Sequence, residues 1–89
     1  MKVKVLYFAS LREQLGRASE DIDLPPGTAT LGALRAQLAG RGGAWQTVLA
    51  DDRPVRMAVN QDMVPRGSAN EAAIKAGDEI AFFPPVTGG

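Results

Sequence analysis

Hydrophobic and polar side chains alternate in several short segments of this chain, a pattern typical of half-buried β-strands. In the first segment, Val3, Val5 and Tyr7 share one face. The segments with this period are residues 2–9, 19–24, 55–60 and 79–83, and a shorter strand is expected at 63–64. Strands are therefore predicted near both ends of the chain. The strand at 19–24 is expected to pair antiparallel with the strand at 2–9.

A helical period replaces the alternation in residues 31–38, where leucines recur at positions 31, 34 and 38. This stripe predicts the main helix of the fold, with one face buried. Thr28 or Thr30 can cap its first turn, because a hydroxyl there accepts from a free backbone N–H. Gly40 and the glycines that follow it are expected to end the helix.

Two shorter helical segments flank the main helix in the sequence. Ser10 and Glu13 match a capping box, which predicts a helix of one to two turns that Gly16 ends. Residues 45–49 are expected to form another helical turn, with Trp45 in the core rather than in a site. The stretch 65–70 carries no periodic signal and is predicted to be a loop.

The element order is strand, strand, helix, strand, short strand, strand. Both terminal strands must find partners in one small sheet, and placing them side by side with the helix across one face satisfies this. We therefore expect an α+β fold of the β-grasp, ubiquitin-like type, with a mixed sheet of four to five strands and one main helix. Residues 1–83 form the predicted domain, and residues 84–89 form a flexible tail.

The second face of the sheet is expected to carry a hydrophobic patch near the tail. Lys2 and Lys4 mark this face as exposed to solvent, and Leu6 and Phe8 point the same way. In the last strand, Phe83 is the better outward candidate, so that Leu6, Phe8 and Phe83 gather beside the tail. The alternative is that a further element covers these side chains and makes them a second core.

Composition narrows the chemistry that the side chains can perform. The 89 residues contain neither cysteine nor histidine, which excludes disulfides, thiol catalysis and the commonest zinc ligand. Ten basic residues balance ten acidic ones, so no net charge favours nucleic acid or an anionic membrane. No apolar run approaches the roughly 20 residues of a membrane span. We expect a cytoplasmic protein with no bound metal or cofactor.

The remaining polar motifs point to structure rather than catalysis. Adjacent carboxylates at 20–21, 51–52 and 78–79 are predicted to be turn or surface residues, because neighbours on a strand point to opposite faces. The glycine cluster at 40–43 lacks the Lys and Ser/Thr of a phosphate-binding loop and follows a helix. It is interpreted as a helix stop.

The C-terminal residues offer a chemistry that needs no catalytic side chain. Two prolines stiffen the exit from the last strand, and the slim Gly88-Gly89 end can enter a narrow channel in a partner. The carboxylate of Gly89 can then be adenylated by ATP and converted to a thiocarboxylate. The segment predicted to thread the partner consists of Pro84, Pro85, Val86, Thr87 and Gly88.

Residues 77–89, Gly-Asp-Glu-Ile-Ala-Phe-Phe-Pro-Pro-Val-Thr-Gly-Gly, resemble the end of molybdopterin synthase small subunits. Residues 5–13 and 58–61 resemble the same family. The resemblance implies that a ubiquitin-activating-type enzyme adenylates Gly89 with ATP and that a sulfurtransferase system makes the thiocarboxylate. Sulfur then passes to cyclic pyranopterin monophosphate in molybdenum cofactor biosynthesis.

The resemblance also implies how the chain assembles. It predicts a non-catalytic subunit that docks with the large synthase subunit, whose active site receives the tail, in a heterotetramer of two small and two large subunits. Phe8, Arg12, Leu6 and Phe83 are the residues expected at partner surfaces.

Other functions remain open at this point. Sulfur carriers for thiamine synthesis also end in Gly-Gly, although they tend to be shorter and lack the Phe-Phe-Pro-Pro-Val-Thr run. A ubiquitin-like modifier would use the same activated Gly89 to form isopeptide bonds with lysines. An interaction module would not need the tail at all. Free-standing catalysis is least supported, because the chain lacks the usual catalytic groups.

Overall fold

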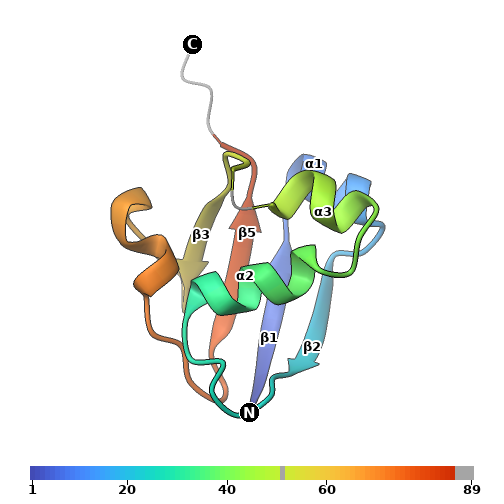
Figure 1. The fold of residues 1–89 in the computed structure, drawn as a ribbon. Coiled ribbons are helices and arrows are strands. Elements are labelled where there is room, and N and C mark those ends of the chain that lie inside the picture. Colours follow the sequence, from blue (N-terminus) through green and yellow to red (C-terminus); the bar gives the residue numbers. More distant parts are fainter. Residues whose placement is uncertain (51, 86–89) are drawn as a thin grey trace.

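The computed structural model describes residues 1–50 and 52–85. Its elements are β1 (Lys2–Tyr7), α1 (Ala9–Leu15), β2 (Ser19–Asp23), α2 (Leu31–Ala39), α3 (Ala44–Leu49), β3 (Arg56–Val59), β4 (Asp62–Met63), the 3₁₀-helix η1 (Arg66–Glu71) and β5 (Glu79–Phe83). The strands form one sheet in the order β2-β1-β5-β3-β4, and α2 crosses one of its faces (Figure 1).

The two terminal strands lie side by side at the centre of the sheet. Val5 of β1 is opposite Ile80 of β5 in a parallel pair, whereas β2, β3 and β4 join their neighbours antiparallel. This mixed sheet with a helix across it confirms the predicted α+β, β-grasp architecture. Both strands carry strongly hydrophobic residues at every second position, on the face toward α2, and this composition suits the buried centre of the sheet.

The core lies between α2 and the inner face of the sheet. The leucine stripe of α2 is fully buried, as are alternate residues of the two central strands. These side chains are Val3, Val5, Tyr7, Ile80, Phe82, Leu31, Leu34 and Leu38. Burying each large aliphatic or aromatic side chain contributes roughly 1.5–3 kcal/mol, so this layer supplies most of the stabilisation. The predicted Thr30 cap is present, with its hydroxyl accepting from the Ala33 amide at 3.2 Å.

The predicted capping box at Ser10 and Glu13 is wrong. Helix α1 begins two residues earlier than that box requires, at Ala9, with Phe8 at the cap position and no side-chain hydrogen bond there. The Phe8 amide donates to Phe82 O at 3.2 Å, and the Phe8 carbonyl accepts from the Leu11 amide at 3.1 Å. The hydrogen bond to β5 holds the main chain of Phe8 at the cap position. Ser10 therefore lies inside the first turn of the helix, where it is not the capping residue.

The stretch predicted to be a loop at 65–70 contains a 3₁₀-helix instead. Helix η1 packs beside α2. The contact is close at Gly32 of α2, where an added Cβ would lie 2.8 Å from the carbonyl oxygen of Asn70, near the end of η1. Polar and small residues can form this turn because α2 provides the surface against which it packs. Local sequence pattern alone carries little sign of it.

Two of the carboxylates predicted to be surface residues are built into the fold. Glu20 accepts from Tyr7 Oη at 2.9 Å and from both terminal nitrogens of Arg41 at 2.9 Å. Burial alone would raise the pKa of Glu20, but the hydrogen bonds from Arg41 and Tyr7 outweigh it and hold that pKa below its ordinary value. Asp78 is 5% exposed.

The Asp78 carboxylate accepts from Asn60 Nδ2 at 3.0 Å and from the Lys75 amide at 2.8 Å. It therefore ties the turn before β5 to the turn after β3.

Trp45 is half-buried and packs on Tyr7 with ring centroids 5.5 Å apart, so its predicted place in the core is confirmed. Asp51 lies outside the described residues.

Candidate functional site

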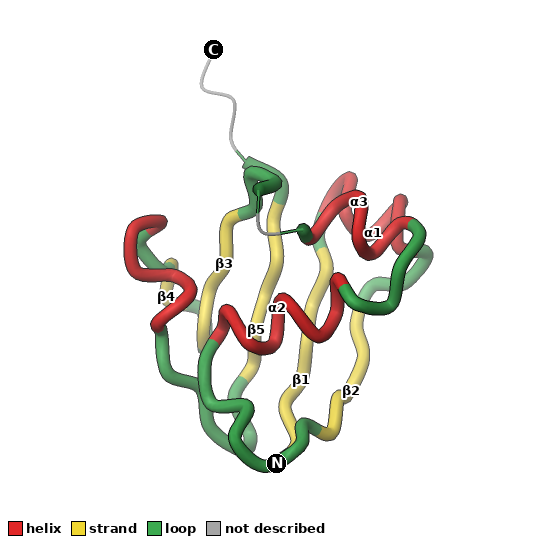
Figure 2. Tube along the Cα trace, in the orientation of Figure 1, coloured by secondary structure: helices red, strands yellow, loops and turns green. Residues whose placement is uncertain are grey.

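The candidate site lies where β5 ends. Strands β1 and β5 run in the same direction and finish at the end of the sheet that α1 and α3 border, opposite the N-terminus (Figures 1 and 2). Pro84 and Pro85 follow β5 directly and are half-buried. The predicted roles of residues 86–89, including the carrier role of Gly89, concern positions outside the described residues.

Phe8 and Phe83 form a stacked aromatic pair at this end of the sheet. Their ring centroids are 4.8 Å apart and their planes are inclined by 6°. Phe8 is 40% exposed, and Leu6 and Phe83 are half-buried. The three side chains are thus partly open to solvent in the described part of the chain, as the predicted hydrophobic surface requires, and they are not enclosed as a second core would be.

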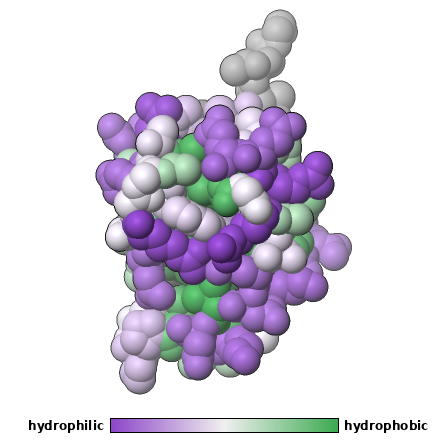
Figure 3. All heavy atoms as spheres, turned by 90° about the vertical axis from the view of Figure 1, so that its right-hand side faces the viewer, coloured by the Kyte–Doolittle hydropathy of each residue, from purple (hydrophilic) through white to green (hydrophobic). Residues whose placement is uncertain are grey.

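The outer face of the sheet changes character along the strands. Residues directly opposite one another share a face, so the strand registers define rows across it. The successive rows are Asp21–Lys4–Glu79, then Leu6–Ala81–Ala58, then Phe83–Arg56. The face is thus charged at the end far from Pro84 and aromatic at the end next to it. On the side of the molecule that carries β2, hydrophilic residues prevail (Figure 3).

A hollow of about 340 Å³ opens beside the aromatic pair. It is lined by Phe8, Ala9, Arg56, Met63, Phe83 and Pro84. Met63 is 51% exposed, and its strand pairing with Ala58 brings it to the outer face of the sheet. Sequence reasoning brought neither Arg56 nor Met63 to the patch, because the hairpin register that places both at the hollow is a tertiary feature.

A second hollow borders the two prolines. It has a volume of about 140 Å³, and its walls come from α1, from Val48 of α3 and from residues 53–55. Pro84 lines both hollows. Because the proline rings fix φ, the chain is stiff at the two positions that follow β5. Arg12 is exposed on α1 and lines neither hollow, so its expected role at a partner surface stays a prediction.

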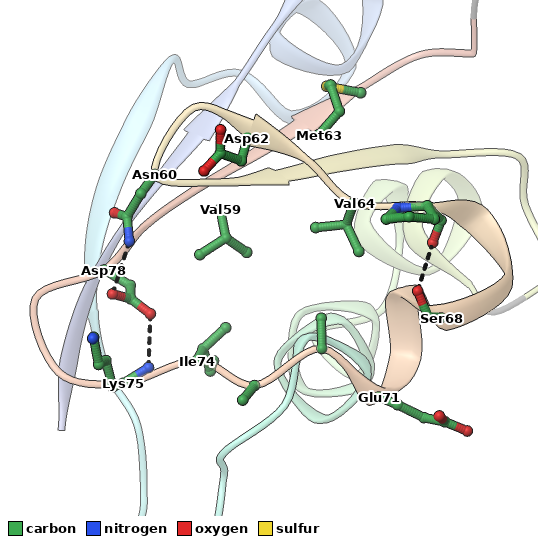
Figure 4. A pocket seen from close by; sticks show the side chains of 13 residues that line it. Val59, Asn60, Asp62, Met63, Val64, Ser68, Glu71, Ile74, Lys75 and Asp78 are labelled. Carbon is green, nitrogen blue, oxygen red and sulfur yellow. Dashed lines mark hydrogen bonds between the residues drawn. The ribbon is translucent and has the colours of Figure 1, made fainter.

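A hollow larger than these two lies elsewhere and lacks a catalytic arrangement (Figure 4). Its volume is about 760 Å³, and Val59, Val64 and Ile74 point toward its centre. Asp78, the most buried carboxylate in it, is already occupied by the hydrogen bonds that fix the adjoining turns. Among residues 1–50 and 52–85, no group of three acidic, His or Cys side chains could hold a metal ion.

None of the helices in the described part of the chain has the length and hydrophobicity needed to cross a bilayer.

Comparison with known proteins decides the family. The model of the ThiS family matches residues 5–89. The chain belongs to the ThiS family. The molybdopterin synthase sulfur carrier subunit of Haemophilus influenzae is 44% identical and that of Escherichia coli 39%, each match covering 98% of this chain and 99% of the relative. The small archaeal modifier protein 1 of Haloferax volcanii is 36% identical, covering 92% of this chain and 94% of that protein.

Solved structures of similar proteins support the same assignment. The crystal structure of the Haloferax volcanii modifier has a TM-score of 0.75 at 31% identity, with full coverage of both chains. A complex of subunits 1 and 2 of the Helicobacter pylori molybdopterin-converting factor contains a chain with a TM-score of 0.67 at 25% identity, again with full coverage. The resemblance drawn from residues 5–13 and 77–89 is confirmed, as is the sulfur-carrier class of function.

Proposed function

We propose that this ThiS-family chain is the sulfur carrier subunit of a molybdopterin synthase and that the carboxylate of Gly89 carries the sulfur. The observation that supports this most directly is 44% identity to such a subunit over nearly the full chain. The partly exposed aromatic pair of Phe8 and Phe83, next to Pro84, supports docking of a partner at this end of the sheet. The absence of Cys and His from the sequence fits a carrier whose catalysts belong to its partners.

The proposed chemistry takes place at the terminal carboxyl group. A carboxylate oxygen of Gly89 attacks the α-phosphorus of ATP, and pyrophosphate leaves. A sulfur nucleophile at the sulfide level then attacks the carbonyl carbon of the acyl adenylate, and AMP leaves with the electron pair of the broken bond. The product is a thiocarboxylate, which delivers its sulfur to cyclic pyranopterin monophosphate. ATP and the sulfur donor are bound by the activating enzyme and the sulfurtransferase.

Docking with a large synthase subunit positions this group. The Helicobacter pylori complex contains both subunits of the related factor, and by analogy we propose that the patch of Leu6, Phe8 and Phe83 contacts the large subunit. The stiff Pro84-Pro85 segment then directs the last residues toward the partner's active site. The working assembly is a heterotetramer of two small and two large subunits in the cytoplasm.

Mass spectrometry of the C-terminal peptide tests the carrier chemistry. The chain is incubated with a cognate adenylating enzyme, ATP and sulfide, and is then digested with trypsin. Lys75 is the last basic residue, so the final peptide is residues 76–89, which contains no Met. A sulfur-for-oxygen mass shift on this peptide is therefore distinct from methionine oxidation. The shift is expected only with ATP, and it disappears when Gly89 is deleted.

An unmodified peptide, obtained with an activating enzyme that is active on a control carrier, would refute the proposal.

A second candidate function is protein modification, which the 36% identity to the small archaeal modifier protein 1 favours. The same activated Gly89 would then form an isopeptide bond with a lysine of another protein. Isopeptide-linked conjugates, detected by mass spectrometry in a cell extract supplied with the chain and ATP, would establish this function. If sulfur reaches the pterin precursor and no conjugates form, the chain has the carrier function and not the modifier function.

A further inference from the structure

Arg56 is an unmatched cation within the docking surface. It lies opposite Phe83 in the β3–β5 register and lines the hollow of about 340 Å³ together with Phe8, Met63 and Pro84. Its Nε is buried and receives no hydrogen-bond acceptor from residues 1–50 and 52–85. No ion pair joins its guanidinium to another described residue. A donor in this state is poised for an acceptor that comes from outside the chain.

The neighbouring residues on the outer face cannot neutralise Arg56. The next row of the sheet consists of Ala58, Ala81 and Leu6, which are apolar. Glu79 lies at the far end of β5, about 13 Å from Phe83 at roughly 3.3 Å per residue. It is opposite Lys4, which is a nearer cation than Arg56. The described rows of the sheet therefore surround the guanidinium with apolar residues and offer it no nearby carboxylate.

Physical chemistry indicates which partner group fits this arrangement. An unpaired donor that loses its water on docking weakens binding, so an apolar partner segment alone would be a poor match. A carboxylate satisfies the planar guanidinium with short, charge-assisted and often bidentate hydrogen bonds. The hollow beside it, which Phe8 and Met63 line, takes an apolar side chain.

We propose that Arg56 selects a partner segment that places an Asp or Glu carboxylate against its guanidinium and an apolar side chain in the adjacent hollow. This inference rests on the proposed function, because it concerns the surface that docks with the large synthase subunit. Arg56 thus determines the specificity of docking, while the Phe8–Phe83 pair supplies the apolar contact area. It takes no part in the chemistry at the terminal carboxyl group.

Binding to the purified cognate large subunit, measured by calorimetry at several salt concentrations, tests the proposal. Arg56→Met keeps an unbranched apolar stem but removes the charge and all donors, and it is expected to weaken binding about tenfold or more. Arg56→Lys keeps the charge without the fork and is expected to bind with intermediate affinity. The matched control is Arg17→Met, which removes an exposed arginine outside the hollow and is expected to leave binding within about twofold.

Two further readouts separate recognition from folding. The affinity of the wild-type chain falls more steeply with added salt than that of Arg56→Met, because an ion pair across the interface is lost. The free Arg56→Met chain is expected to be at least as resistant to urea as the wild type, since the variant lacks the unmatched buried donor. Weaker binding by a chain of undiminished stability distinguishes docking from a structural role.

The outcomes also separate this inference from the proposed function. Wild-type chain that fails to bind the large subunit would refute both. Wild-type chain that binds, while Arg56→Met binds equally well or shows the same salt dependence, would overturn the role of Arg56 alone. A loss of affinity that Arg17→Met shares would point to general electrostatic attraction and would also overturn it.

Discussion

Replacing Arg35 by methionine should destabilise the domain more than any surface arginine can. Arg35 lies in α2, is 6% exposed, and donates to three backbone carbonyls at the end of α3 and just after it. Its Nε is 2.8 Å from Leu49 O, and one terminal nitrogen is 2.7 Å from both Ala50 O and Arg53 O. The guanidinium thus fixes the segment that forms a wall beside Pro84 and Pro85.

The size of the effect follows from the burial of each acceptor. A hydrogen bond from a charged donor contributes about 1.5–3 kcal/mol, and this applies in full at the buried Leu49 carbonyl. Ala50 is half-buried and Arg53 is exposed, so water can replace part of those bonds, which leaves about 0.5–1 kcal/mol each. The free energy of unfolding should therefore fall by about 2.5–5 kcal/mol. For a domain of this size, that lowers Tm by roughly 10 °C or more.

Urea unfolding followed by circular dichroism, with a thermal scan, measures both quantities. Arg12→Met is the matched control, because Arg12 is an exposed helical arginine and the two residue types have similar helix propensities. The control should change the free energy of unfolding by less than about 0.5 kcal/mol. A loss below about 1 kcal/mol for Arg35→Met, at an unchanged m-value, would refute the idea that these three bonds hold the segment.

Two further predictions concern long-range contacts of the fold. Hydrogen bonds from Arg41 and Tyr7 hold the pKa of Glu20 below 4.5, so its contribution to stability is complete well above pH 4.5 and is lost as the pH falls below that value. Urea midpoints at neutral pH and at about pH 3.5 should therefore converge for wild type and Glu20→Gln on acidification; a constant difference would contradict this. Gly32→Ala should lower the urea midpoint despite better helix propensity, because its Cβ would meet Asn70 O at 2.8 Å, and a stabilised variant would refute the clash.

The pattern of the sequence was sufficient for the elements whose signal is local. The alternation in β1 and β5 and the leucine stripe of α2 identified the inner faces correctly, because side-chain direction follows directly from strand and helix geometry. The same rule placed Phe8 and Phe83 on the outer face before their stacking was known. The sequence also predicted the antiparallel pairing of β1 with β2 and the neighbouring positions of β1 and β5, but it did not give the places of β3 and β4 in the sheet.

The errors fall where distant residues decide a local structure. Ser10 carries a capping signal, yet the bond between Phe8 and Phe82, residues far apart in the sequence, starts α1 earlier. Glu20 and Asp78 look like surface carboxylates in sequence, because nothing near them in the chain indicates that Arg41 and Asn60 will supply their hydrogen bonds. In such places, contacts that form only in the folded chain override the local conformational propensity.

The sequence by itself therefore determined the β-grasp class, the hydrophobic face toward the helix and the candidate chemical group at Gly88-Gly89, because each depends on residues that are adjacent or periodic in the chain. Only the tertiary structure decided that Arg56 and Met63 lie in one hollow with Phe8 and Phe83. Their meeting depends on strand register, which is fixed by packing across the whole sheet and not by any one segment.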